Sequence, residues 1–228
     1  MRWTSFTKNR RIQIGGAGGP EVMELVEEVV PEPGAGEVLI RHEAIGVNFL
    51  DAYHRAGVYP LEYPVGLGME AAGVIEVIGA GVSTFKAGDR VCYVGGPSQS
   101  KYVGGLPGAY ADYRCLPADL LIPLPDDVTF EVAAAVLLKG MTAEFLLHRT
   151  YPVQPGDTVL VQAAAGGVGT VLTQWAAHLG AKVIGVSRDA AKQDIMRENG
   201  CDLALVGSDE TIVDAVMEFT NSAGVQVA

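Results

Sequence analysis

Cysteine is scarce in this chain, and its three cysteines lie far apart. Cys92, Cys115 and Cys201 form no CxxC pair, which excludes a dense disulfide framework and favours a reducing compartment. No uninterrupted apolar run approaches the roughly 18 residues that a membrane-spanning helix needs, so no membrane partner is expected. Basic residues are few as well: 16 Lys and Arg stand against 27 Asp and Glu. The net charge of −11 argues against binding nucleic acids or anionic membranes, because either partner requires a basic face.

The pattern of the first residues does not predict a secretory signal. Residues 1–11 are polar and basic, and no apolar stretch follows them. The cations Arg2, Lys8, Arg10 and Arg11 would fit a transit peptide, but the segment is short for one. We therefore expect a cytoplasmic protein.

The first half of the chain has the pattern of a small β-domain. A length of 228 residues allows one or two domains. From residue 12 to about 125, short apolar runs alternate with clusters of glycine and proline, which predicts a small, partly open β-barrel. The predicted strands are 37–48, 72–79, 89–94 and 110–116.

From Thr129 onward the pattern becomes helical and then alternates. Thr129 is suited to cap a helix over 129–139, and a second helix is predicted over 141–148. Strands and helices then alternate, which predicts a parallel sheet covered on both faces. The fold class is therefore α/β: a β-barrel domain over residues 1–126 and a doubly wound nucleotide-binding domain over 127–228, truncated after the start of its fourth strand. The predicted elements of the second domain are strands 158–161, 182–187, 203–206 and 224–228, and helices 168–179, 188–199 and 210–222.

The stretch from Gln162 to Gly169 is the most informative motif. It joins a buried strand to a helix, and Ala164, Gly166 and Gly169 fill the small-residue positions of a dinucleotide-binding turn. Such a turn lets the backbone approach a pyrophosphate, while the helix N-terminus offers free N–H groups to it. The predicted cofactor contacts here are Ala164, Gly166, Gly167, Val168 and Gly169.

The next strand bears on the choice between NADPH and NADH. NAD enzymes of this type place a carboxylate about twenty residues after the turn. Here that strand ends in Ser187 and Arg188, and Lys192 follows, so a 2′-phosphate is favoured and NADPH is the predicted cofactor. Asp189 would oppose a phosphate if it turned inward. Alternatively, Ser187 caps the next helix and Lys192 belongs to a solvated face.

Several motifs together resemble the zinc-free quinone oxidoreductases (zeta-crystallin-like) of the medium-chain dehydrogenase/reductase superfamily. The resemblance runs from about residue 12 to the end of the chain. It implies a GroES-like β-domain followed by a Rossmann domain, and a homodimer in the full-length family form. The matching stretches are 18–22, 46–51 with Tyr53, 57–60, 66–73, 138–142 and 163–169.

The residues at the metal positions argue against zinc. Zinc-dependent members of the superfamily have Cys where this chain has Asn48, and His where it has Met69. Neither Asn nor Met is a usual zinc ligand, and the nearby pair Asp51 and His54 would supply only two ligands. We therefore predict that the protein holds no metal.

The resemblance also assigns roles to individual residues. It implies that Asn48, Asp51 and Tyr59 surround the substrate and the nicotinamide, and that Lys139 and Thr142 contact the cofactor. Tyr59 would donate a hydrogen bond to the substrate oxygen, although it could equally be a half-buried aromatic beside Pro60.

The expected activity is hydride transfer from NADPH to quinones or other small conjugated carbonyl compounds, without zinc. Two alternatives remain open. One is a reductase of the double bond of enones, alkenals or enoyl thioesters. The other is an NADPH-binding fragment without turnover.

Overall fold

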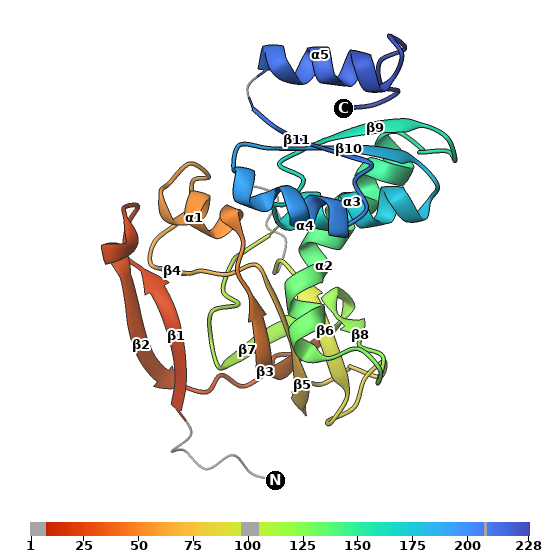
Figure 1. The fold of residues 1–228 in the computed structure, drawn as a ribbon. Helices are drawn as coiled ribbons and strands as arrows, with labels where there is room; N and C mark the ends of the chain where they lie inside the picture. The colour runs from red at the N-terminus through yellow and green to blue at the C-terminus, as the bar shows by residue number, and fades with distance from the viewer. Residues whose placement is uncertain (1–7, 97–104, 208) are drawn as a thin grey trace. The chain divides into compact units, whose positions relative to one another are not determined.

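The computed structural model describes residues 8–96, 105–207 and 209–228 (Figure 1). The chain divides into two compact units, Met1–Leu137 and Leu138–Ala228. The predicted domain boundary at 126/127 lies just ahead of helix α2 (Phe130–Glu144), whose first half packs against apolar residues of the first unit.

The first unit consists mainly of antiparallel strands. Strands β2, β1 and β4 form one sheet, and β7, β3, β5, β6 and β8 form a second one in that order. Its main apolar core lies along β3, β5 and β6 and includes Ile40, Ile75 and Tyr93. The strands are β1 (Lys8–Ile14), β2 (Met23–Val29), β3 (Glu37–Gly46), β4 (Val65–Gly66), β5 (Glu70–Ile78), β6 (Arg90–Val94), β7 (Tyr113–Pro117) and β8 (Ile122–Pro123).

The four strands predicted for this half correspond to β3, β5, β6 and β7, but the β1–β2 hairpin was not predicted. Its seven paired positions run from Lys8 opposite Val29 to Ile14 opposite Met23. Only Asn9 and Ile14 of β1 are buried, and β2 is exposed along nearly its whole length. The alternation of apolar and polar residues that reveals a half-buried strand is therefore absent.

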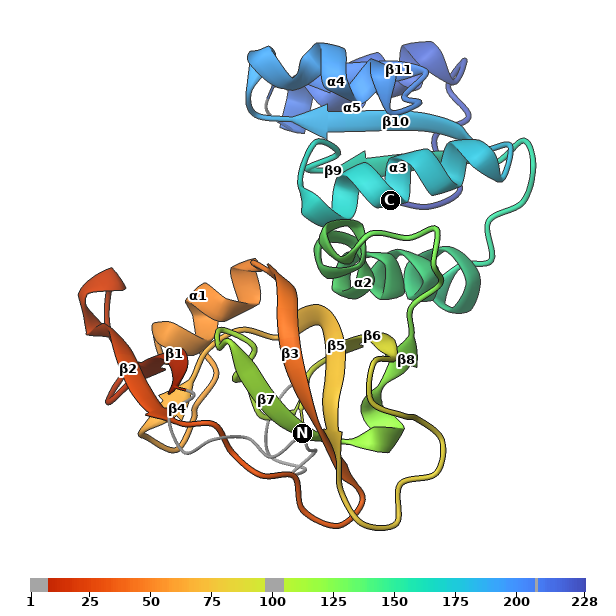
Figure 2. The same ribbon diagram turned by 90° about the horizontal axis from the view of Figure 1, so that it is seen from below.

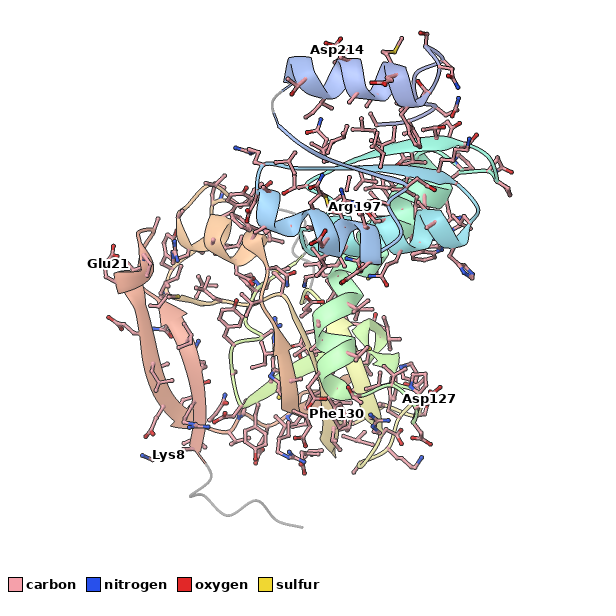
Figure 3. The ribbon with its side chains drawn as sticks, in the orientation of Figure 1. Lys8, Glu21, Asp127, Phe130, Arg197 and Asp214 are labelled. Carbon is pink, nitrogen blue, oxygen red and sulfur yellow. The ribbon has the colours of Figure 1, made fainter. Side chains whose placement is uncertain are left out.

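Helix α2 is continuous, whereas the sequence predicted a break at Gly140. It runs into a π-helix over Phe145–Thr150. One glycine inside a helix costs only about 1 kcal/mol, which a long helix tolerates. The predicted cap is confirmed, because the Val132 N–H donates to Thr129 Oγ1 at 3.3 Å. Phe130 lies at the first turn of α2 (Figure 3). The Arg90 guanidinium lies 4.5 Å from the centre of its ring.

The second unit is a parallel sheet with helices on both faces. Strands β9 (Thr158–Gln162), β10 (Lys182–Ser187) and β11 (Leu203–Val206) are arranged in the order β11-β10-β9. Helices α3 (Gly167–His178) and α4 (Gln193–Glu198) cover one face, and α5 (Asp209–Phe219) covers the other (Figures 1 and 2).

The chain after α5 returns to the open edge of β9. Leu160 N–H donates to Val227 O at 2.9 Å, and Gln226 N–H donates to Thr158 O at 3.0 Å. The bridge between Val159 and Val227 is parallel. The strand order is therefore 3-2-1-4, the order of the first four strands in a doubly wound nucleotide-binding domain, as the sequence predicted.

Across the ranges that the structure describes, no helix combines the length and apolarity required to cross a bilayer.

Candidate functional site

The glycine turn forms a tight loop between β9 and α3. Gly166 N–H donates to Ala163 O at 2.7 Å, and α3 begins at Gly167. A Cβ added at Gly169 would lie 2.2 Å from Ala163 O and 2.8 Å from Ala164 Cα. Only glycine fits there without moving the backbone of the turn.

Two alanines complete the turn in different ways. Ala163 has a φ of 51°, in the left-handed region that costs an L-residue about 1–2 kcal/mol. Backbone strain of this kind concentrates at ligand-binding sites. Ala164 is fully buried, and its Cβ lies 2.9 Å from where a Cβ on Gly185 of β10 would stand. A side chain at position 185 would therefore meet the Ala164 methyl group, and it would come still closer, 2.4 Å, to Cys201 Sγ.

A pocket of about 280 Å³ opens beside this turn. The end of β10 supplies its second wall, so the structure brings the turn together with all three residues predicted to select the cofactor. Arg188 and Lys192 are exposed there, and neither forms an ion pair with any residue in the described ranges. The pocket is lined by Gln162, Ala163, Ala165, Gly166, Val186, Ser187, Arg188, Asp189 and Lys192.

Lys139 also reaches the turn, but Thr142 is not shown to do so. A Cβ on Gly167 would lie 3.1 Å from Lys139 Cε and 3.3 Å from its Cδ, so the stem of this lysine passes over the start of α3. The Thr142 hydroxyl donates to Leu138 O at 2.9 Å within its own helix.

In the first unit, a hydrogen-bonded network surrounds the start of α1 (Phe49–Arg55). Asp51 Oδ2 accepts from the Asn48 N–H and from the Tyr110 hydroxyl, both at 2.8 Å. The Asn48 side-chain amide donates to Glu70 Oε1 at 2.8 Å. Burial, reinforced by the bond to the Asp51 carboxylate, raises the pKa of Tyr110 well above its usual range. The hydroxyl therefore keeps its proton and serves as a fixed donor.

Tyr59 lies at the end of a chain of aromatic contacts. Its ring contacts Tyr53 and His54 edge-on, with centroids 6.1 and 5.9 Å apart, and Tyr53 contacts the exposed Phe49 at 5.9 Å. The Tyr59 side chain is half-buried. Within the described part of the chain its hydroxyl makes no hydrogen bond.

Three residues of this region were not predicted as site residues. Glu70 is a fully buried carboxylate, Tyr110 orients Asp51, and His54 is a fully buried histidine. Neither ring nitrogen of His54 has a hydrogen-bond partner among the described residues, and burial lowers its pKa. Glu70 had a visible signal, since it is the only charge in an otherwise apolar stretch from Leu67 to Ile75. Tyr110 had none, because its partner lies 59 positions away.

Asn48 and Met69, which occupy the positions of zinc ligands in related enzymes, make hydrogen-bonding and packing contacts here. The Asn48 amide is bound to Glu70, and Met69 is fully buried. Among the residues that the structure describes, no three His, Cys, Asp or Glu side chains gather as a metal site would require. The absence of zinc stays a prediction, and metal analysis of the purified protein tests it.

Comparisons with known proteins agree with this geometry. Residues 34–126 match the alcohol dehydrogenase GroES-like domain, and residues 167–228 match the zinc-binding dehydrogenase family. A quinone oxidoreductase of Pseudomonas aeruginosa is 43% identical over 213 residues, covering 93% of this chain and 63% of the relative. The 2-haloacrylate reductase of a Burkholderia species is 44% identical over 216 residues, covering 92% and 62%. The crystal structure of Escherichia coli quinone oxidoreductase complexed with NADPH matches with a TM-score of 0.88 at 40% identity, covering 96% and 65%.

A GroES-like domain followed by a parallel nucleotide-binding sheet defines the medium-chain dehydrogenase/reductase superfamily, and the predicted fold class is confirmed. Within this superfamily the chain belongs to the quinone oxidoreductase family, as its motifs predicted. It spans less than two thirds of the length of the relatives named above.

Proposed function

We propose that the protein is an NADPH-dependent quinone reductase. The observation that carries this proposal is the pocket beside the glycine turn, where two cations, Arg188 and Lys192, and one carboxylate, Asp189, stand beside the small residues of the turn. Two cations without ion-pair partners in the described chain suit the 2′-phosphate of NADPH, which the neutral ribose of NADH lacks. Helix α3 begins at Gly167 after the N-cap Gly166, so its first turn offers backbone N–H groups to a diphosphate with no Cβ atom at these two positions.

Bound NADPH would supply the hydride, and the protein would supply position and hydrogen bonds. Lys139, beside Gly167, and Thr142 are proposed as further cofactor contacts, together with Ala164, Val168 and Ser187. The Asn48 side chain is hydrogen-bonded to Glu70, and the Asp51 side chain is hydrogen-bonded to Tyr110. Both residues therefore hold the start of α1 in place. The Tyr59 hydroxyl is then the group that donates to the substrate oxygen as negative charge develops there.

Removing the Lys192 ammonium tests the cofactor assignment. We expect Lys192→Ala to weaken NADPH binding about 10- to 100-fold, because a charge-assisted contact contributes about 1.5–3 kcal/mol. NADH binding should change little. Calorimetric titration of both nucleotides measures the two effects. Lys182→Ala, which removes an exposed lysine from the other end of β10, is the matched control. An equal loss for both nucleotides would refute the 2′-phosphate role.

Removing the Tyr59 hydroxyl tests the substrate side. Tyr59→Phe should lower the kcat of quinone reduction about tenfold, the value of one good hydrogen bond, with NADPH affinity unchanged. Steady-state oxidation of NADPH by an ortho-quinone measures this. Tyr63→Phe, at an exposed tyrosine outside the aromatic chain, should retain the parent rate. Parent kinetics in Tyr59→Phe would leave Tyr59 with a packing role only.

A double-bond reductase is the second candidate, because the Burkholderia relative is named for 2-haloacrylate, a conjugated acid. Parallel assays with an ortho-quinone, an alkenal and an enoyl thioester separate the two activities. Cofactor binding without turnover on any of them would identify a non-catalytic NADPH-binding protein. A cooperative melt that NADPH shifts upward would show that the 228-residue chain folds and binds.

The cellular setting is inferred from the sequence and the family. All three cysteines are free, which agrees with a reducing, cytoplasmic location. The family resemblance supports a homodimer for the full-length form. Sedimentation of the purified chain tests its oligomeric state.

A further inference from the structure

Asp189 lies on the wall of the pocket that would take the adenosine ribose. It is twenty residues beyond Gly169 (189 − 169 = 20), the spacing at which NAD-dependent enzymes place the carboxylate that binds a ribose 2′-hydroxyl. It follows β10 by two residues and lines the pocket together with Arg188 and Lys192.

Local hydrogen bonds fix the carboxylate in this place. Asp189 Oδ1 accepts from the Ala191 N–H at 3.0 Å, so the side chain caps the short 3₁₀ turn over Ala190–Lys192. The Asp189 N–H donates to Ser187 Oγ at 3.1 Å, and that hydroxyl donates back to Asp189 O at 3.3 Å. Rotation of the Asp189 side chain to another rotamer would break the cap.

The pocket therefore presents opposing charges to its ligand. Arg188 and Lys192 attract a 2′-phosphate, whereas the Asp189 carboxylate repels it. Toward NADH the relation is reversed, because a carboxylate oxygen accepts a hydrogen bond from the free 2′-hydroxyl. The Asp189 carboxylate thus lowers the affinity for NADPH and raises the affinity for NADH.

We propose that Asp189 is a specificity-determining residue that makes this site accept NADH beside NADPH. This inference rests on the proposed nucleotide-dependent function and deepens it. The 228-residue chain then binds both nucleotides and prefers NADPH. Asp189 reduces the ratio of its affinity for NADPH to its affinity for NADH.

The test is Asp189→Asn, which removes the charge but keeps a residue that caps helices equally well. The matched control is Asp194→Asn on α4, where the exposed carboxylate pairs with Arg197 at 2.9 Å and lies outside the pocket. Calorimetry with NADPH and with NADH, at low and at high ionic strength, gives four dissociation constants for each variant.

At low ionic strength, Asp189→Asn should tighten NADPH binding about tenfold and weaken NADH binding about two- to fivefold. The gain for NADPH should shrink at high salt, which a purely structural effect of the cap would not do. Asp194→Asn should match the parent throughout.

Two negative results have different meanings. If the parent chain binds neither nucleotide, the proposed function is wrong and this inference is wrong with it. If the parent binds but the ratio of the two dissociation constants is unchanged in Asp189→Asn, only the role of Asp189 is overturned. An equal gain for both nucleotides overturns it as well.

Discussion

Gly169→Val is expected to abolish nucleotide binding and to lower the melting temperature of the chain. The new Cβ would lie 2.2 Å from Ala163 O and 2.8 Å from Ala164 Cα, so the turn must open before valine fits. Forcing a side chain into a packed site costs about 1–3 kcal/mol or more, and here the displaced atoms are the cradle itself. Titration with NADPH and thermal unfolding measure the two losses.

A matched substitution separates this effect from a general cost of replacing glycine. Gly16→Val lies in the first unit, where nothing stands within 4 Å of the added Cβ and the backbone is not left-handed. We expect it to bind NADPH and to melt like the parent. Tight NADPH binding by Gly169→Val would show that the turn does not hold the cofactor.

The second large effect concerns acid stability and depends on His42. Its Nδ1–H donates to Ala111 O at 2.7 Å, and its Nε2 accepts from the Tyr93 hydroxyl at 2.9 Å. Burial, together with the nearby Arg114 charge, lowers the pKa of His42 from 6.5 to about 4. The folded protein therefore holds this ring neutral over a range in which the unfolded chain protonates it.

The sign of the effect follows from the direction of that pKa shift. The stabilisation is complete above pH 6.5 and is lost as the pH falls through about 4. Between pH 6.5 and about 4, protonation of His42 in the unfolded chain should lower the free energy of unfolding by ~3 kcal/mol. Chemical unfolding followed by circular dichroism at several pH values measures the slope.

Two histidine variants identify the source of that slope. His42→Gln should be less stable at pH 7 and should lose part of the decline toward pH 4. His178→Gln, at the exposed end of α3, should keep the parent slope. Identical slopes in the parent and in His42→Gln would contradict the assignment.

The second unit was predictable from the sequence because its signals are local. The strands at 182–187 and 203–206 have the predicted bounds, and the turn at 163–169 leads into a helix as expected. Each of these elements depends on apolar runs and glycines that are contiguous in the chain. The π-helix beyond α2 and the exposed β1–β2 hairpin have no comparable local signal in the sequence.

The polar network of the first unit was only partly predictable, for a related reason. Asn48 and Asp51 lie three residues apart in a recognisable motif, so both were named from the sequence. Glu70 and Tyr110 reach them from β5 and from the segment before β7. Partners joined by tertiary hydrogen bonds cannot be identified from one sequence, because no local pattern records which distant strands become neighbours.

Gly185 on β10 packs against Ala164 of the turn that follows β9. Which residues the nucleotide-binding motif can hold therefore depends on both strands. An alanine replaces the first glycine of the motif because the facing position on β10 has no side chain. A methyl group at position 164 and one at position 185 would lie only 2.9 Å apart, so the two positions cannot both carry a methyl group without a shift. Ala164→Gly should therefore make Gly185→Ala more tolerable only when Cys201, whose Sγ would lie 2.4 Å from the added Cβ, is also made smaller. A one-dimensional motif search does not detect such a combined exchange.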